Sequence, residues 1–128
     1  MAISALKLGC SPVYAFDIDP ETIGVARENA QNNGIADELL DLREASLEGY
    51  DNGNMQFDIV AANILSPALI AGRHKLLSMV KPGGHLILAG ILDTEYHTVK
   101  EKFEELGCVQ LKSTQEKEWR GGYFSVPL

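Results

Sequence analysis

The sequence predicts an α/β fold built on a mostly parallel β-sheet that helices cover. Three observations support this prediction: short apolar runs alternate with amphipathic segments along the chain, the runs over 57–63 and 85–91 are apolar on both faces, and helix-start and helix-stop signals lie between them. With 128 residues, of which 45% are hydrophobic and 23% charged, the chain is expected to form one globular domain over residues 1–128.

The first strand and helix follow from local signals. Residues 13–17 form a short apolar run that ends in Asp17, which is typical of a buried strand. A helix is predicted directly after it, because Asp19 can cap free backbone N–H groups and Pro20 suits the first helical position. The Asn-Gly pair at 33–34 supplies the stop signal.

Similar patterns predict the other elements. Strands are expected over 39–44, 57–63 and 85–91, helices over 67–80 and 93–106, and two closing strands over 109–112 and 119–126, joined by a turn at 114–117. The Lys-Pro-Gly-Gly segment at 81–84 is expected to end the helix over 67–80, since proline cannot continue a helix and glycine permits a turn.

Charge and composition disfavour several classes of function. The 11 Lys and Arg against 18 Asp and Glu give a formal net charge of −7, which disfavours nucleic-acid binding. Cys10 and Cys108 form no metal-ligand pattern and are interpreted as reduced thiols, and His74, His85 and His97 show no ligand spacing, so no metal site is predicted. The lack of a long apolar run predicts no membrane span, and a cytoplasmic location is expected.

Polar residues end several of the predicted strands. Ligands of open α/β sheets bind beyond the carboxyl ends of the strands, so Asp17, Ser46, Asn63 and a bend at residues 90–92 are candidates for the site and are expected to line one cleft. A carboxylate placed like Asp17 can accept hydrogen bonds from both hydroxyls of a ribose; the alternative is that it helps to cap the following helix. The acid alone does not separate NAD from S-adenosylmethionine. Trp119 is interpreted as a packing residue of the closing hairpin.

Four segments carry a resemblance to a known family. They read Val-Tyr-Ala-Phe-Asp-Ile-Asp-Pro at 13–20, Ala-Arg-Glu-Asn-Ala at 26–30, Ala-Asn-Ile-Leu at 62–65, and Lys-Pro-Gly-Gly-His-Leu-Ile-Leu-Ala-Gly-Ile-Leu at 81–92. Together they resemble the ribosomal-protein methyltransferase PrmA family, which belongs to the class I S-adenosylmethionine-dependent methyltransferases. The resemblance implies a Rossmann-like class I methyltransferase fold, with a mostly parallel sheet and a C-terminal antiparallel hairpin.

The resemblance also implies roles for single residues. Asp17 would bind the ribose of S-adenosylmethionine, Ile18 would pack beside the adenine, and Ser46, where an acid is common, would contact the adenine amino group. Asn63 would be the catalytic residue and a cofactor contact, holding the methionine end or the incoming amine; the alternative is a cap of the next helix. The implied reaction transfers a methyl group in line to a neutral amine of a large-subunit ribosomal protein, which depends on alignment and desolvation.

Class I methyltransferases begin the cofactor site with a strand and a glycine-rich loop, and this sequence is expected to lack both. Residues 1–9 resemble the end of the helix that follows the loop. The chain is therefore interpreted as N-terminally truncated, without the family's separate substrate-recognition domain. We expect weak or absent cofactor binding by this chain alone. The two exposed strand edges are expected to close up against each other, to pair between chains as a homo-oligomer, or to take up a strand from another polypeptide.

Two other interpretations stay open at this point. One is a non-enzymatic remnant of the methyltransferase fold that acts as an assembly or interaction module. The other is a fragment of an NAD-dependent Rossmann enzyme, which also carries an acid after its second strand. The Ala-Asn-Ile-Leu and Lys-Pro-Gly-Gly segments favour the methyltransferase over the NAD enzyme.

Overall fold

The computed structural model describes residues 2–10 and 12–128, which divide into two compact units. The first unit comprises residues 1–50 and the second comprises residues 51–128. The single domain over residues 1–128 stays a prediction.

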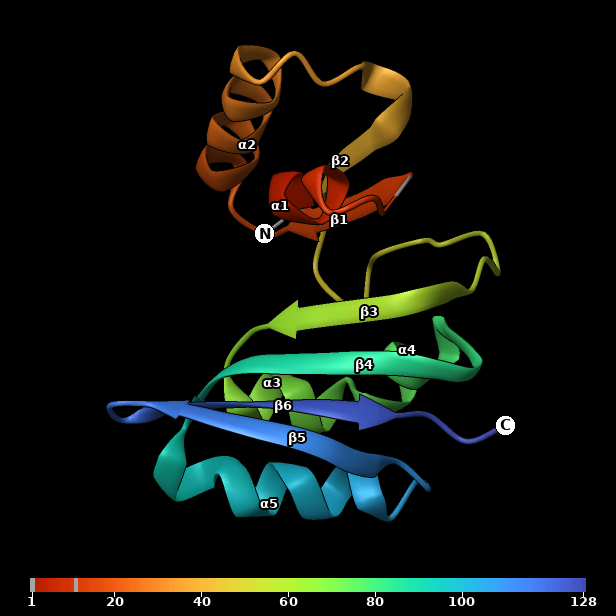
Figure 1. Cartoon of the computed structure of the whole chain (residues 1–128), viewed down its shortest axis with the longest axis vertical. Helices are drawn as coiled ribbons and strands as arrows, with labels where there is room; N and C mark the ends of the chain where they lie inside the picture. The colour runs from red at the N-terminus through yellow and green to blue at the C-terminus, as the bar shows by residue number, and fades with distance from the viewer. Residues whose placement is uncertain (1, 11) are drawn as a thin grey trace. The chain divides into compact units, whose positions relative to one another are not determined.

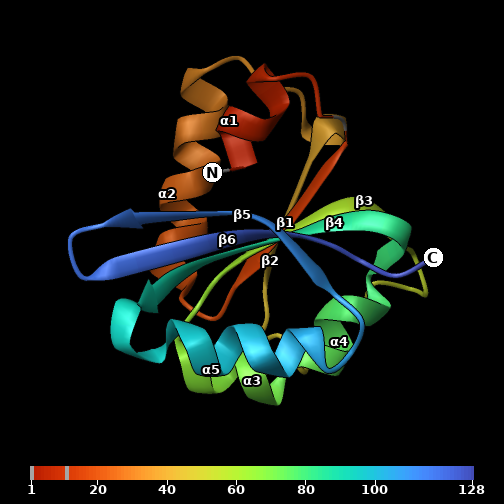
Figure 2. The same ribbon diagram turned by 60° about the horizontal axis from the view of Figure 1, so that its bottom comes forward.

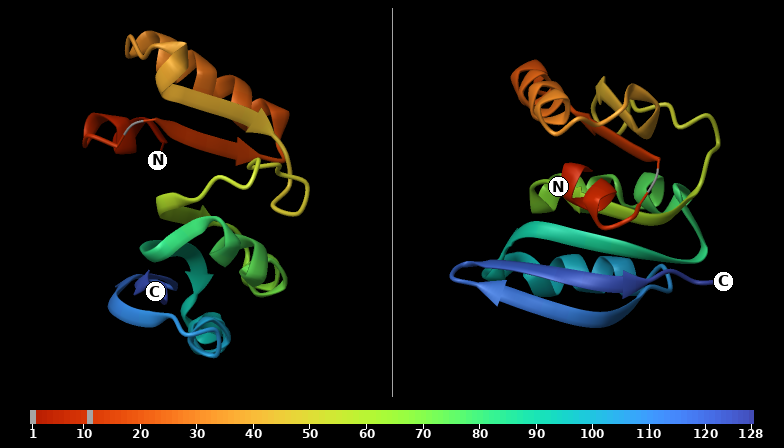
Figure 3. Two further views of the ribbon diagram at one scale, coloured as in Figure 1. Left: turned by 90° about the vertical axis from the view of Figure 1, so that its right-hand side faces the viewer. Right: turned by 45° about the horizontal axis from the view of Figure 1, so that its top comes forward.

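The first unit is a two-stranded parallel sheet with helices. Its elements are α1 (Ala2–Lys7), β1 (Val13–Asp17), α2 (Pro20–Asn32), the 3₁₀ turn η1 (Asp37–Leu39) and β2 (Leu40–Glu44). Strands β1 and β2 pair in parallel, and α2 runs alongside them (Figure 3, left). The strand over residues 13–17 is confirmed, and α1 lies in the segment expected to be the end of a helix, of which Met1 falls outside the described residues.

The predicted signals set both ends of α2. The Asp19 side chain accepts a hydrogen bond of 2.9 Å from the Glu21 backbone N–H, and Pro20 occupies the first turn. At the other end, Asn33 is the C-cap and Gly34 has φ +66°, a conformation that favours glycine. The helix therefore begins and ends where the sequence predicts.

The second unit is a four-stranded mixed sheet with three helices. Its elements are β3 (Phe57–Asn63), α3 (Ser66–Ala71), α4 (Arg73–Ser78), β4 (Val80–Leu92), α5 (Asp93–Glu104), β5 (Val109–Glu116) and β6 (Trp119–Ser125). The strand order is β3-β4-β6-β5, as Figure 1 shows. Strands β3 and β4 pair in parallel, whereas β6 is antiparallel to both β4 and β5. The predicted C-terminal antiparallel hairpin is confirmed.

The core of the second unit lies between this sheet and its helices. Helices α3, α4 and α5 all lie on one face of the sheet (Figure 2). The fully buried large side chains of the core are Leu69, Leu86, Leu88, Ile91, Val99, Phe103 and Phe124. Leu86 and Leu88 are two residues apart on β4 and point to the helical face, as strand geometry requires.

Two predictions about element boundaries are wrong. The single helix predicted over 67–80 is two helices, α3 and α4, with Gly72 between them, and α4 ends at Ser78. The Lys-Pro-Gly-Gly segment at 81–84 is part of β4 instead of a turn, because Val80 already pairs with Phe57 of β3. The register shifts across this segment, and Gly84 fits where a Cβ atom would lie 2.9 Å from the Asp58 carbonyl oxygen.

The predicted turn at 114–117 is also placed wrongly, because 114–116 still belong to β5 and pair with β6. The reversal occurs at Lys117 and Glu118, where Lys117 has φ +56°.

Strand edges remain open in both units. Among the described residues, β1 pairs with β2 on one side and β3 pairs with β4 on one side, so each has a second edge without a strand partner.

Within the same part of the chain, none of the helices has the length and hydropathy of a membrane span.

Candidate functional site

Asp17, Ile18 and Ser46 lie together at the carboxyl ends of β1 and β2. The two strands stay paired up to this end, where the Ala45 backbone N–H donates to the Asp17 carbonyl oxygen at 3.0 Å. One oxygen of the Asp17 carboxylate accepts a 2.9 Å hydrogen bond from the Asp19 backbone N–H, which fixes the direction of the side chain. Asp19 is the N-cap of α2, and Asp17 supports the start of the helix by binding the backbone N–H of that residue.

Ile18 and Ser46 complete this cluster with different surfaces. The Ile18 side chain is 70% exposed, which leaves an apolar surface beside the Asp17 carboxylate. The Ser46 hydroxyl accepts a 3.0 Å hydrogen bond from the Gly49 backbone N–H, and its own proton is not used in that bond. The first unit thus presents an acceptor, an apolar surface and a hydroxyl at one end of its sheet.

Asn63 lines a cleft in the second unit. It is the last residue of β3, and the cleft of about 360 Å³ is lined by Asn63, Ile64, Leu65, Gly90 and Trp119. Leu65 is 70% exposed and Trp119 is 43% exposed, so the walls are apolar and Asn63 is the polar side chain among them. Such a cleft suits a ligand that is largely apolar with one polar group.

The Asn63 amide does not cap the next helix. The N-cap of α3 is Leu65, and it makes no side-chain capping bond. Within the described part of the second unit, no hydrogen bond to the Asn63 side chain is formed, so its amide faces the cleft with its bonding capacity unused. The capping interpretation of Asn63 is therefore wrong.

Trp119 lines the candidate cleft as well as packing in the closing hairpin. It begins β6 opposite Leu92 of β4 and reaches the cleft that contains Asn63. The sequence indicates this position only by an aromatic residue at the start of a predicted closing strand. The pairing of β6 with β4 is needed to place Trp119 near Asn63, because it brings Trp119 to the carboxyl end of β4.

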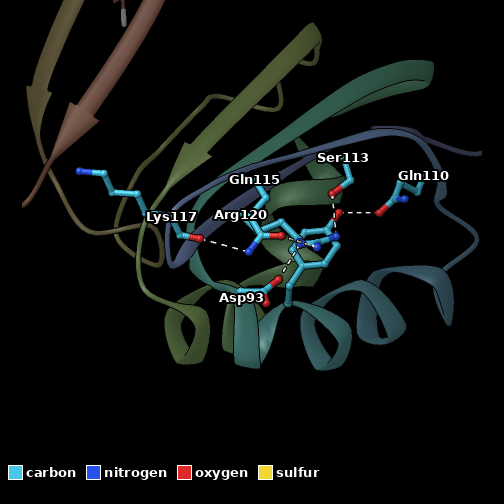
Figure 4. A network of polar contacts seen from close by, with 7 residues as sticks. Asp93, Gln110, Ser113, Gln115, Lys117 and Arg120 are labelled. Atoms are coloured by element: carbon cyan, nitrogen blue, oxygen red, sulfur yellow. Dashed lines mark hydrogen bonds and ion pairs between the residues drawn. The ribbon is translucent and has the colours of Figure 1, made fainter.

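A polar network holds the hairpin that carries Trp119. Arg120 forms an ion pair of 2.8 Å with Asp93 at the start of α5, and it donates to Gln115 of β5 at 2.9 Å (Figure 4). Its guanidinium lies 5.3 Å from the centre of the Tyr96 ring. Burial raises the pKa of the Tyr96 hydroxyl, which donates to Gln110 at 2.5 Å. These contacts join α5 to both strands of the hairpin.

A larger hollow of about 720 Å³ lies in the first unit, between α2 and β2. Its walls include Tyr14, Arg27 and Leu42, but none of the predicted site residues. It lies away from the strand ends where ligands of α/β sheets bind, so it is not the candidate site.

Within the described residues, no group of three or more His, Cys, Asp or Glu side chains could hold a metal ion.

Parallel strands with polar side chains at their carboxyl ends, followed by an antiparallel hairpin, define a Rossmann-like class I methyltransferase fold, and solved methyltransferases share it. A model of the family described as "Ribosomal protein L11 methyltransferase (PrmA)" matches residues 1–122. The chain belongs to this family.

Individual proteins agree with the family match. The ribosomal protein L11 methyltransferase of Geobacter metallireducens is 40% identical over 119 residues, which cover 93% of this chain and 38% of the relative. The chain spans about two fifths of the length of the curated relatives it matches.

Solved structures extend the comparison to the fold. The crystal structure of the ribosomal protein L11 methylase of Lactobacillus delbrueckii subsp. bulgaricus has a TM-score of 0.88 and 31% identity, covering 99% of this chain and 64% of that one. The N-methyltransferase NodS of Bradyrhizobium japonicum, solved with S-adenosyl-l-homocysteine, has a TM-score of 0.69 and 14% identity, covering 90% of this chain and 66% of NodS. The second likeness concerns the fold alone.

Proposed function

We propose that this chain contributes the binding residues of an S-adenosylmethionine-dependent N-methyltransferase that acts on amino groups of ribosomal protein L11. The observation that carries the proposal is the pair of strand-end clusters, Asp17 with Ile18 and Ser46 in one unit and Asn63 in the other, within a segment that matches the PrmA family. The substrate follows the names of the relatives, which are L11 methyltransferases.

The first cluster is suited to adenosine. A carboxylate can accept hydrogen bonds from both ribose hydroxyls, and Asp17 uses one oxygen in a single bond to its own turn. Ile18 offers an exposed apolar surface for the flat face of adenine, and the Ser46 hydroxyl can contact a polar edge of the ring. The donor set therefore fits the nucleoside part of S-adenosylmethionine.

The second cluster is suited to the amine that accepts the methyl group. S-adenosylmethionine, when bound, supplies an electrophilic methyl group on a sulfonium. The Asn63 amide oxygen can accept a hydrogen bond from an amine N–H, which would orient the nitrogen lone pair. Leu65 and Trp119 give the same cleft apolar walls, which would favour a neutral amine over a charged ammonium once a bound substrate covers them.

The proposed partner is a protein substrate and not a nucleic acid. Ribosomal protein L11 is the proposed substrate, in the cytoplasm where ribosomal proteins are used. The net charge of −7 supports a protein substrate over a nucleic acid, because it repels a phosphate backbone.

A chimera provides the test of this function. The matched segment of the Geobacter metallireducens relative would be replaced by this chain, and transfer of a labelled methyl group from S-adenosylmethionine to L11 would be measured. We expect the chimera to be active and Asp17→Asn to weaken S-adenosylhomocysteine binding by about tenfold or more in calorimetry, because one charge-assisted hydrogen bond contributes roughly 1.5–3 kcal/mol.

Asp41→Asn is the matched control, because Asp41 lies in the middle of β2 and pairs with Arg43 at 2.9 Å. It should leave binding of S-adenosylhomocysteine unchanged. Thermal stabilisation of the chimera by NAD but not by S-adenosylhomocysteine would contradict the proposal, as would equal binding by the Asp17 and Asp41 variants.

A further inference from the structure

A β-bulge in β4 lies directly beside Asn63. Leu88 pairs with Gly122 of β6 and Ile91 pairs with Arg120, so two residues of β4 stand opposite one residue of β6. The two residues of the bulge are at positions 89 and 90, and position 89 pairs with Asn63 on the other side of the strand. The bulge is therefore in contact with the end of β3.

Gly90 is the residue of the bulge that touches the Asn63 amide. A Cβ atom built on Gly90 would collide with the Asn63 side-chain oxygen and lie 3.4 Å from its Cγ. Gly90 also has φ +75°, in the left-handed region that side-chain-bearing residues rarely adopt. Glycine at position 90 is therefore required twice: the backbone there is left-handed, and the Asn63 side chain leaves no space for a Cβ atom.

The backbone facing the bulge is equally close. A Cβ atom on Gly121 of β6 would lie 2.9 Å from the Leu88 carbonyl oxygen. The strand opposite the bulge therefore needs glycine at position 121. A side chain at position 90 would have to displace the amide.

We propose that Gly90 is a positioning residue, whose bare Cα holds the Asn63 amide in the direction needed to orient the acceptor amine. This inference rests on the proposed function, because it assigns Asn63 to the amine. The amide has no hydrogen bond to fix it in the described second unit, so packing on Gly90 is the contact that sets its direction. The glycine at position 90 is thus needed for the site and not for the bend alone.

Gly83→Ala is the matched control for backbone strain. Gly83 has φ +77°, and a Cβ atom there would meet the Leu128 side chain at 2.8 Å, outside the cleft. Both alanine variants therefore introduce a side chain at a left-handed position on β4. The two differ in whether that side chain meets Asn63.

The first measurement is a double-mutant cycle on thermal stability of the 128-residue chain. Gly90→Ala should lower Tm more than Gly83→Ala does, since collision with the amide adds to the strain. In an Asn63→Ala background the loss from Gly90→Ala should shrink, because the colliding atoms are gone. Additive losses in Tm would overturn the proposed contact without bearing on the methyltransferase function.

The second measurement is methyl transfer by the chimera. Gly90→Ala should lower kcat on the order of 100-fold, the cost of misplacing a reacting group by about 1 Å, with KM for S-adenosylmethionine unchanged. Gly83→Ala should leave kcat and KM unchanged. A Gly90→Ala chimera with full kcat would overturn the positioning role, whereas a parent chimera that transfers no methyl group would contradict the proposed function.

Discussion

At the scale of single residues, burial separates the two cysteines. Both are free thiols; Cys10 is exposed and Cys108 is 3% exposed. Burial raises the pKa of the Cys108 thiol, so the reactive thiolate forms at higher pH than for an exposed cysteine. The interpretation of both as unpaired thiols agrees with the structure, but their different environments are a tertiary property.

Iodoacetamide labelling tests this difference. In the native chain near neutral pH we expect one label, on Cys10, while Cys108 stays unmodified because it is both inaccessible and protonated. Mass spectrometry of peptides would count the labels, and the chain unfolded in guanidinium is the control that should gain two. Rapid labelling of Cys108 in the native chain would be inconsistent with its burial.

At the scale of elements, the contact between α5 and the β5–β6 hairpin depends on Tyr96 and Arg120. The Tyr96 hydroxyl lies where a Cβ atom on Gly122 would collide with it, so the glycine of β6 makes room for the tyrosine of α5. The hydroxyl then reaches Gln110 of β5. Gly122 of β6 is therefore explained by the helix that packs against the strand.

Tyr96→Phe should lower the free energy of unfolding of the second unit by about 1 kcal/mol, because it leaves the Gln110 side chain without its donor. The ring and its contact with the Arg120 guanidinium are kept. Urea unfolding followed by Trp119 fluorescence would report this, since Trp119 is the one tryptophan of the sequence.

Asp93→Asn is the comparison variant for this network. The Asp93 side chain is 43% exposed, so solvent screens its ion pair with Arg120, and the expected loss is below about 1 kcal/mol. A larger loss from Asp93→Asn than from Tyr96→Phe would show that the ion pair, and not the buried hydroxyl, holds the hairpin on α5.

At the scale of the whole molecule, the two units differ in the size of their cores. Among the residues whose burial the structure describes, the first unit buries the hydrophobic residues Ile23, Ala30, Leu40 and Tyr50, whereas the second unit buries about three times as many. A unit of about 50 residues with so few buried side chains is marginal on its own. The units are therefore expected to differ in local stability.

Hydrogen exchange measured by mass spectrometry would show this difference. We expect amides of β1 and β2 to exchange well before those of β4 and β6, because the second unit contains the fully buried leucines and phenylalanines. Peptides from α5 serve as the internal reference for full protection. Equal protection of the two units would contradict the expectation.

Local signals account for the elements that the sequence predicted correctly. The strands over 13–17 and 57–63 have the predicted bounds, but the prediction that they are buried is wrong. Ala62 is the one buried residue of the two strands and Ile59 is 48% exposed, because each strand has a strand partner on one side alone. The cap at Asp19 fixes the start of α2, and the left-handed conformation of Gly34 fixes its end. Candidate residues at strand ends followed from these bounds, since the end of a parallel strand marks the binding edge.

The sequence by itself determined the class of fold, the family and the strand-end positions of Asp17 and Asn63. Tertiary structure decided the bulge at Gly90, the place of Trp119 in the cleft and the strand conformation of residues 81–84. Each of these depends on pairing between segments far apart in the chain. Local propensity cannot specify such pairing, because the same glycine serves a turn, a bulge or a close approach according to what lies across from it.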